Sequence, residues 1–350
     1  MVVLGIDAHK RNHTAVAADE RGRELGTHTT GTTSSDHLRL LAWARRFGEH
    51  RLWAVEDCRQ LSRRLEADLL AAGERIVRVP PKLMANCRKA ARTYGKSDPI
   101  DALAVARAAL REPDLPTAQL DGPSRELRLL VDYREDLVTE RTRIINRMRW
   151  HLHELDPGLD PPARSLTHSR QVAVVEDFLR DSDGIVARLA RRLLARCQAL
   201  TDEIRELEKE ITGRIETLAP NLLKIPGCGT LTAAKILGET ADVTRFRSEA
   251  AFARHNGTAP LPVWSGNRAR HRLSRTGNRQ LNTALHRIAV TQAHYHPDAR
   301  AYLQRRQNAG NTTTEAIRAL KRHLSDVVYR ALRRDARESH SNVITLATAA

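Results

Sequence analysis

Four carboxylates in the first third of the chain have the chemistry and spacing of a metal site. Asp7 and Glu56 each end a short apolar run of the kind that forms a buried strand. Asp98 and Asp101 lie three residues apart at a predicted helix start, so they share one face of that helix. Hard divalent cations take oxygen ligands, and two ions about 4 Å apart can hold both oxygens of a phosphodiester that undergoes displacement. The four side chains therefore indicate a site for Mg²⁺ (or Mn²⁺).

Each of the four carboxylates also has a structural explanation. Asp98 and Asp101 fit the cap position of a helix and its capping-box partner. Asp7 can be a strand-end residue that faces solvent, and Glu56 can pair with an arginine. Any one position favours these explanations, whereas the order of strand, strand and helix favours the metal site. The residues by themselves leave both open.

Ser265 lies in a stretch that is dense in arginines. A serine hydroxyl is a poor nucleophile unless a base or a metal activates it. Arginines suit a phosphate because they form bidentate hydrogen bonds and stabilise developing charge. The arginines that follow this serine are Arg268, Arg270, Arg272, Arg275 and Arg279. Spacing alone favours a loop that binds a DNA backbone, with Ser265 as one hydrogen-bond donor among several.

A second feature that suits a phosphate is the turn at residues 226–229. Glycines let backbone N–H groups approach a phosphate closely, so Gly227 and Gly229 can bind DNA independently of base sequence. Lys224 and Lys235 flank the turn and add positive charge. The alternative is an ordinary helix–turn–helix connection.

The charge of the chain favours a polyanionic partner. The 350 residues carry a formal net charge of +16 and the sequence pI is about 10.5, which makes nucleic acid the default partner. Aromatic residues make up only 4%, which argues against recognition built on stacked single-stranded bases. The four cysteines form no CxxC pair and fit a reducing compartment. Without a signal peptide or an apolar run that could cross a bilayer, we expect a soluble, cytoplasmic protein with no membrane partner.

Strand and helix signals alternate over residues 1–123. Apolar and β-branched stretches predict strands at residues 2–7, 13–19, 24–30, 51–57 and 74–79. Helix signals cover residues 34–47, 59–72 and 97–107. Three strands in hairpin order, followed by strands that alternate with helices, make a mixed α/β sheet.

The rest of the chain is predicted to be mainly helical. Apolar residues at helical spacing indicate long helices at 124–155 and 170–217. We interpret residues 124–217 as an antiparallel arm for oligomerisation, and two surface helices packed on a core are the alternative. Residues 218–335 form a third unit with a helix-hairpin-helix-like turn, and residues 336–350 are predicted to be a disordered tail.

Two sets of motifs resemble the DEDD transposases of the "IS one-ten" insertion-sequence family, the bridge-RNA-guided recombinases. The first set is Gly5-Ile6-Asp7-x-x-Lys10, Glu56 at the end of its strand, and Lys96-Ser97-Asp98-x-x-Asp101-Ala102. The second set is Ile225-Pro226-Gly227-x-Gly229, Phe246, Ala259-Pro260, Ser265-Gly266 and Arg275-Thr276-Gly277-Asn278-Arg279-x-Leu281. Both sets follow the order of the family and together cover nearly the whole chain, which makes the resemblance specific.

The resemblance implies a fold of class α/β plus α, with an RuvC-like (RNase H-type) N-terminal domain, a helical coiled-coil arm and a C-terminal transposase domain. It gives the acidic metal-binding roles to Asp7, Glu56, Asp98 and Asp101, and the role of nucleophile to Ser265. It also implies composite active sites shared between the subunits of a homo-oligomer, a dimer to a tetramer. Donor and target DNA and a noncoding bridge RNA are the implied partners, in a bacterial, nucleoid-associated setting.

Two other hypotheses stay beside the RNA-guided, Mg²⁺-dependent transposase or recombinase with a serine nucleophile. An RuvC-like nuclease or junction resolvase that uses water would still cut DNA after Ser265→Ala. A non-catalytic nucleic-acid scaffold would use its carboxylates as caps and salt-bridge partners, and would cut no DNA even with Mg²⁺. The transposase hypothesis instead predicts that Asp7→Ala and Ser265→Ala each abolish recombination while largely sparing nucleic-acid binding.

Overall fold

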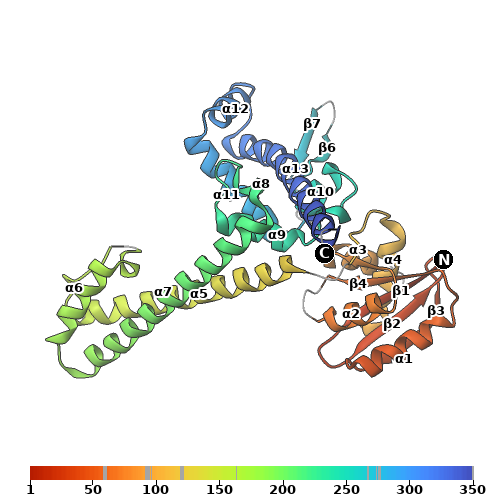
Figure 1. The fold of residues 1–350 in the computed structure, drawn as a ribbon, viewed down its shortest axis with the longest axis horizontal. Helices are drawn as coiled ribbons and strands as arrows, with labels where there is room; N and C mark the ends of the chain where they lie inside the picture. Colours follow the sequence, from red (N-terminus) through yellow and green to blue (C-terminus); the bar gives the residue numbers. More distant parts are fainter. Residues whose placement is uncertain are drawn as a thin grey trace. The chain divides into compact units, whose positions relative to one another are not determined.

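The chain folds into two compact units, shown in Figure 1 as a computed structural model. The first unit consists of Met1–Asp121 with Asp242–Asn278, and the second of Gly122–Ala241 with Arg279–Ala350. The structure describes residues 1–57, 61–90, 95, 97–118, 122–162, 164–265, 268–272, 274 and 277–348. Among these described residues, no helix is both long enough and apolar enough to cross a membrane.

A five-stranded mixed sheet forms the centre of the first unit. Its strands are β1 (Val2–Ala8), β2 (His13–Ala18), β3 (Glu24–Thr30), β4 (Arg51–Glu56) and β5 (Ile76–Val79). They lie in the order β3-β2-β1-β4-β5. The first three pair as antiparallel neighbours, whereas β4 is parallel to both β1 and β5. The predicted mixed sheet is confirmed.

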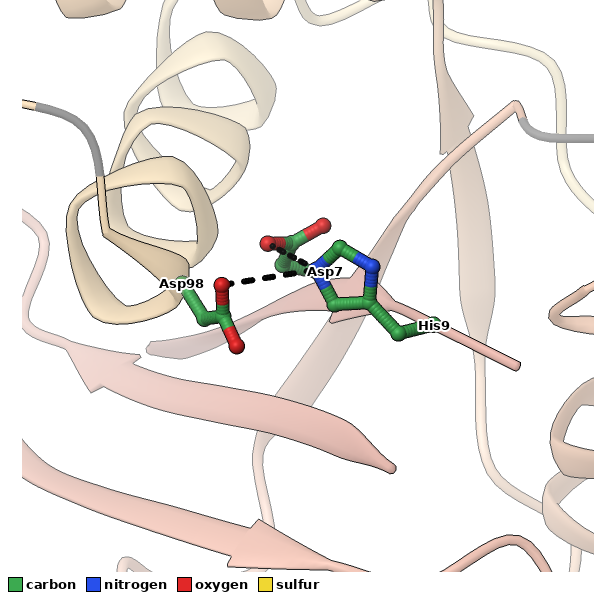
Figure 2. A group of neighbouring side chains, drawn as sticks. All are labelled: Asp7, His9 and Asp98. Atoms are coloured by element: carbon green, nitrogen blue, oxygen red, sulfur yellow. Dashed lines mark hydrogen bonds and ion pairs between the residues drawn. The ribbon is translucent and has the colours of Figure 1, made fainter. Parts of the chain in front are cut away.

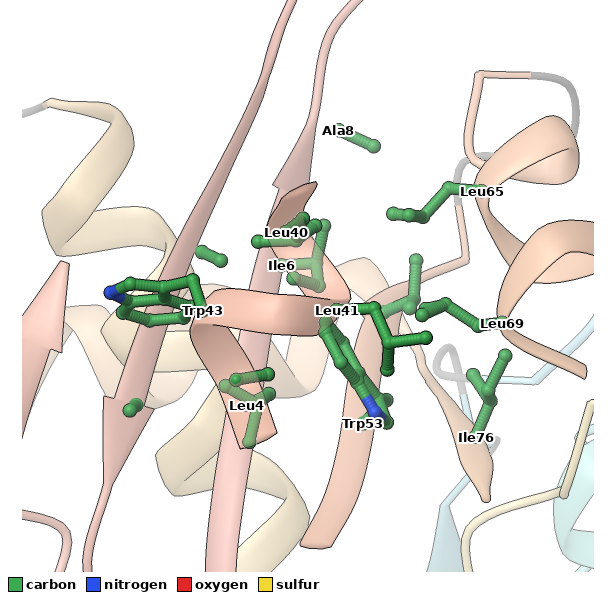
Figure 3. Packing of buried hydrophobic residues seen from close by; sticks show 14 of the residues in the cluster. Leu4, Ile6, Ala8, Leu40, Leu41, Trp43, Trp53, Leu65, Leu69 and Ile76 are labelled. Carbon is green, nitrogen blue, oxygen red and sulfur yellow. The ribbon is translucent and has the colours of Figure 1, made fainter. Parts of the chain in front are cut away.

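Helices cover both faces of the sheet. They are α1 (Ser34–Arg45), α2 (Arg63–Ala71), α3 (Pro81–Lys89) and α4 (Asp98–Arg111). Leu4 and Ile6 of β1 pack in the core under α1 and α2, which Figure 3 shows, whereas Val3 packs with residues of α3 and α4. Because side chains alternate along a strand, Asp7 is directed to the same face as Val3, toward α4.

A glycine in β1 allows α4 to lie directly on the sheet. A Cβ atom at Gly5 would lie 2.0 Å from the carbonyl oxygen of Ala102 and 2.6 Å from the backbone nitrogen of Ala106. No side chain fits in that space, so only glycine permits this approach. Because Gly5 lies two residues before Asp7, the close packing also brings the start of α4 to the end of β1.

The segment Asp242–Asn278 belongs to the first unit, although the sequence predicts it within a unit of residues 218–335. It contains η2 (Val243–Arg245), α10 (Glu249–His255), β6 (Leu261–Ser265) and β7 (Arg268–Arg272). Two ion pairs join this segment to the end of α4 and the residues that follow it. Arg254 pairs with Glu112 at 3.0 Å, and Arg247 pairs with Asp114 at 2.5 Å.

The basic stretch of residues 264–272 contains paired strands where the sequence predicts a loop. β6 and β7 form an antiparallel pair in which Val263 lies opposite Arg270 and Trp264 lies opposite Ala269. Valine and tryptophan favour extended backbone, which explains why these residues form a strand in spite of the many arginines.

A long pair of helices dominates the second unit. This part contains α5 (Pro123–Leu155), η1 (Ser165–Thr167), α6 (Ser169–Arg180) and α7 (Gly184–Leu218). α5 and α7 are antiparallel, because Arg134 of α5 pairs with Glu208 of α7 while the later Glu140 pairs with the earlier Arg196. An antiparallel pair of long helices is therefore observed, and its use as an arm for oligomerisation stays a prediction. The helical stretch predicted at 170–217 is divided into α6 and α7, and Gly184, the first residue of α7, has a φ of +94°.

The remaining helices complete the second unit. They are α8 (Pro220–Leu223), α9 (Thr230–Thr240), α11 (Arg279–Tyr295), α12 (Pro297–Asn308) and α13 (Thr313–Thr348). α13 thus continues beyond residue 336, where the sequence predicts a disordered tail. Asp335 accepts hydrogen bonds from both the backbone and the side-chain nitrogen of Asn221, and Glu338 accepts a third. These bonds anchor the start of the predicted tail as helix.

Candidate active site

The four predicted acidic residues come together at one corner of the first unit. The parallel register of β1 and β4 pairs Ile6 with Val55, so the next residues, Asp7 and Glu56, end adjacent strands. Asp98 and Asp101 lie in the first turn of α4, on the face of the sheet toward which Asp7 is directed. Sequence reasoning thus identified an acidic cluster whose members arrive from two strands and one helix.

Burial and mutual repulsion shape the electrostatics of this acidic cluster. Burial raises the pKa of Asp7, which is only 6% exposed, and the nearby charges of Asp101 and Asp98 add to this effect, while His9 opposes it. Burial likewise raises the pKa of Glu56, followed by the charges of Asp7 and Asp101. Carboxylates that raise one another's pKa in this way are typical of a cation-binding site.

The capping explanation for Asp98 and Asp101 does not describe what the structure shows. Ser97 is the N-cap of α4, and its side chain makes no capping hydrogen bond. Asp98 is already the first helical residue, and its carboxylate lies toward His9. The Asp101 carboxylate instead accepts a hydrogen bond from Nη1 of Arg88, at 2.7 Å. Neither carboxylate therefore serves as the cap of α4.

His9 is a member of the site that the sequence reasoning missed. Figure 2 shows its ring between two carboxylates, with Nε2 3.1 Å from Oδ2 of Asp7 and 3.5 Å from Oδ1 of Asp98. Its backbone N–H donates to the carbonyl of Asn12, at 2.9 Å, which helps to fix the connection between β1 and β2. The available signal was its position two residues after Asp7, because alternate residues of extended backbone share a side.

Asp7, His9 and Asp98 fit a divalent ion. One ligand atom from each lies within 4.8 Å of the other two. Neighbouring ligand atoms around an ion with bonds of about 2.1 Å are themselves roughly 3 Å apart. The separations of 3.1 and 3.5 Å from His9 are close to that spacing. Two carboxylate oxygens and one imidazole nitrogen make a mixed donor set of the kind that binds divalent ions such as Mn²⁺.

Ser265 lies in the same compact unit as the acidic cluster. Its backbone ends β6 and pairs with Arg268 of β7. Its side chain lies outside the described residues, as do the side chains of Arg268, Arg270 and Arg272 and the whole of Arg275. Arg279 begins α11 and is exposed. The role of Ser265 and of these arginines in binding or catalysis therefore stays a prediction.

The predicted glycine turn joins α8 to α9. Gly227 has a φ of +80°, and Gly229 is the N-cap of α9; both are exposed. Nζ of Lys224 donates to Oδ1 of Asn221 at 2.9 Å. Lys235 does not face a ligand: it is buried and pairs with Asp132 and Glu135 of α5.

Two family models match the chain. Residues 4–157 match a model for DEDD transposases of the IS110 type, described as "Transposase". Residues 219–304 match a model described as "Transposase IS116/IS110/IS902 family". The two matched regions contain the acidic residues and the glycine turn, respectively, and the second also contains Ser265.

Curated proteins of insertion elements are similar to nearly the whole chain. The chain is 29% identical to "Insertion element IS116 uncharacterized 44.8 kDa protein" of Streptomyces clavuligerus, over 94% of each chain. It is 26% identical to "Insertion element IS900 uncharacterized 42 kDa protein" of Mycobacterium paratuberculosis, over 95% of this chain and 96% of that one. It is 28% identical to "Transposase for insertion sequence element IS1328" of Yersinia enterocolitica, over 68% of each.

Solved structures of RuvC from Thermus thermophilus also match. RuvC in complex with a Holliday junction substrate matches with a TM-score of 0.26 and 19% identity, over 32% of this chain and 94% of that chain. RuvC alone matches with a TM-score of 0.27 and 18% identity, over 34% of this chain and 100% of that chain.

Proposed function

Because the chain belongs to the IS116/IS110/IS902 family of DNA transposases, we propose that it performs Mg²⁺-dependent strand cleavage and exchange with Ser265 as nucleophile. The observation that carries the metal part is the acidic cluster. Asp7, Glu56, Asp98 and Asp101 come from distant parts of the sequence and nevertheless influence one another's charge at the end of β1. Carboxylates gathered in this way repel one another, and a bound cation would offset that repulsion.

Asp7, His9 and Asp98 are the residues that would hold the ion. A divalent ion bound there supplies positive charge for the phosphate oxygens on which negative charge develops. Burial of Asp7 favours this role, because a carboxylate removed from water gains more from a bound cation than an exposed one does. His9 and Asp98 are about half exposed, so the position is open to a DNA phosphate.

Ser265 would perform the covalent step. Its Oγ forms a bond to phosphorus as the bond from phosphorus to one DNA oxygen breaks, and the departing oxygen takes up the proton that the serine releases. The phosphodiester is thereby exchanged for a phosphate bond to Ser265. A hydroxyl of the partner DNA can then attack this phosphate, which joins the two strands and releases the serine. The place of Ser265 in the matched transposase region 219–304, just before a run of arginines that suits a phosphate, supports this assignment.

Arginines and the glycine turn would hold the nucleic-acid backbone. The net charge of +16 and the run of arginines after Ser265 suit phosphate contacts, which position a duplex without reading its sequence. Exposed Gly227 and Gly229 leave backbone N–H groups accessible at the start of α9. Sequence selection is then left to a noncoding bridge RNA that pairs with donor and target DNA.

The α5–α7 arm would join subunits into a dimer or tetramer. Several large apolar side chains of this arm are exposed, including Trp150 at 74% and Ile185 at 54%. Exposed apolar side chains of this size are typical of a surface that contacts another chain. A composite site, with the acidic cluster from one subunit and Ser265 from another, is part of the proposal.

Strand cleavage by matched variants tests the function. The full chain is incubated with the noncoding RNA that flanks the element, donor and target DNA, and either Mg²⁺ or a chelator. We expect recombination only with Mg²⁺, and none from Ser265→Ala or Asp7→Asn, while both variants still bind RNA and DNA. Full recombination by both variants would refute the proposal, whereas cleavage that persists in Ser265→Ala would assign the reaction to water.

A further inference from the structure

The acidic cluster has two sides that contact different nitrogen-bearing side chains. On the first side, Nε2 of His9 lies between the carboxylates of Asp7 and Asp98. On the second side, the Arg88 guanidinium donates to Oδ1 of Asp101. Its charge also acts on Glu56, and less on Asp7. His9 and Arg88 thus contact different members of the acidic cluster.

Arg88 is held in place by the packing of its helix. It lies in the last turn of α3, and the neighbouring Cys87 and Met84 are buried in the core that α3 shares with α4. Asp101 itself is buried in the first turn of α4. A guanidinium stays protonated at any physiological pH, so Arg88 places a permanent positive charge beside Asp101 and Glu56.

A second divalent ion would therefore face repulsion on the Arg88 side. An ion that used Asp101 and Glu56 would have to displace the 2.7 Å hydrogen bond or accept a guanidinium beside it. The His9 side has the opposite character. A neutral imidazole is a ligand for a divalent ion, and the spacing of its nitrogen from the two carboxylate oxygens suits a single ion.

We propose that the acidic cluster binds one divalent ion, between Asp7, His9 and Asp98, and that the Arg88 guanidinium supplies the second positive charge, on Asp101 and Glu56. This inference rests on the metal-dependent function proposed above and specifies how many ions the site takes. Arg88 is then a positioning residue, because it holds Asp101 in place without a metal, and His9 is a ligand.

The number of ions that the site binds can be measured without any activity assay. The chain is titrated with Mn²⁺, and the free ion is detected by electron paramagnetic resonance. The full-length chain should bind one Mn²⁺ tightly. Arg88→Gln should bind two, because Asp101 and Glu56 lose their counter-charge, whereas Arg88→Lys should keep to one. Lys89→Gln is the matched control: it removes the same charge from the neighbouring exposed residue of α3 and should also bind one. His9→Gln should weaken the first ion by at least about tenfold.

The outcomes separate this inference from the proposed function. Two tightly bound ions in the unmodified chain would overturn the inference while leaving a metal-dependent reaction intact. An unchanged count in a folded Arg88→Gln variant would also overturn it. If the unmodified chain bound no Mn²⁺, the metal-dependent function would fail together with the inference. A thermal melt of each variant shows that it is folded, and the count of the unmodified chain decides the question even if Arg88→Gln is unstable.

Discussion

At the level of single residues, the buried carboxylate of Asp7 suits the proposed metal site but lowers the stability of the fold. Burial raises the pKa of this carboxyl, which means that the folded chain disfavours its charged form relative to the unfolded chain. The charged form of Asp7 therefore opposes folding. A bound cation reverses this effect, which explains how an unfavourable residue can serve the function.

Replacing Asp7 by asparagine should therefore separate stability from activity. In metal-free buffer, Asp7→Asn should raise the melting temperature, because the amide keeps the shape and removes a disfavoured charge. The rate of strand cleavage should fall, because the variant loses several kcal/mol of transition-state stabilisation, the contribution typical of a catalytic metal. Differential scanning calorimetry and a cleavage assay on the same preparation measure both effects.

Asp36 provides the control for the Asp7 prediction. Its pKa is lowered by hydrogen bonds from the side chain and backbone of Thr33, which form the capping box of α1. Asp36→Asn should therefore lower the melting temperature and leave cleavage unchanged. A lower melting temperature in both variants would show that the charge of Asp7 is satisfied in the fold, contrary to this account.

His13 makes the stability of the first unit depend on pH. This residue is 1% exposed and stacks on His37 at 5.4 Å between ring centroids. Burial lowers its pKa to about 4, and the charges of His37 and His9 contribute. The unfolded chain takes up a proton near the ordinary pKa of about 6.5, whereas the folded chain does not until about 4.

The sign of the His13 effect follows from where the proton binds. Between pH 6.5 and 4 the unfolded state binds more protons than the folded state does. The contribution of neutral His13 to the stability of the folded state is therefore complete above pH 6.5 and is lost as the pH falls. We expect the free energy of unfolding to fall by as much as about 1.4 kcal/mol per pH unit in this window. Denaturant titrations at several pH values should show a shallower slope for His13→Gln; an equal slope would contradict the shift.

At the scale of elements, the contact between β1 and α4 decides whether the site can form. Gly5 has no space for a Cβ atom, so any side chain there forces α4 away from the sheet and moves Asp98 and Asp101 from Asp7. Gly5→Ala should destabilise the chain by about 1–3 kcal/mol, the range typical of overpacking. It should also weaken Mn²⁺ binding, which distinguishes displacement of α4 from a general loss of stability.

Gly213 in α7 is the matched control for Gly5. A Cβ atom there would meet nothing within 4 Å, and the residue lies inside a helix. Gly213→Ala should therefore stabilise the chain by about 0.5–1 kcal/mol and leave metal binding unchanged. Equal effects of the two substitutions would show that the close approach of α4 does not control the site.

The elements also show which features a sequence can predict. β1 to β4 were predictable because apolar residues alternate or run together and turn residues separate them. The four carboxylates were predictable as a cluster because each stands at an end of such an element. Arg88 was not, because nothing local marks a side chain that turns toward a residue distant in the sequence, whereas His9 could have been found from its position two residues after Asp7. The β6–β7 pair was hidden by its arginines, and the break at Gly184 by the apolar pattern on both sides.

At the scale of the whole molecule, the grouping of residues by contact departs from the order of the chain. The first unit includes β6 and β7, which are separated in sequence from the sheet by α5 to α9. Ion pairs from Arg247 and Arg254 hold this segment near the end of α4, a long-range pairing that spacing alone does not predict. The unit with the acidic residues therefore also contains the proposed nucleophile.

A mixture of two inactive variants tests whether active sites are shared between subunits. If each site takes the acidic cluster from one subunit and Ser265 from another, equal amounts of Asp7→Asn and Ser265→Ala should restore about one quarter of the sites in randomly mixed assemblies. Recombination by the mixture, measured against each variant alone, checks this. A mixture as inactive as its components would place both groups of a site in the same subunit.

The most direct measurement of the central claim is the identity of the atom joined to DNA during the reaction. The full chain is incubated with the noncoding RNA, Mg²⁺ and both DNA sites, and the denatured product is digested and analysed by mass spectrometry. We expect a nucleotide linked through phosphate to the peptide that contains Ser265, absent from Ser265→Ala and from samples without metal. Cleaved DNA with free ends and no protein adduct, or an adduct on another residue, would contradict it.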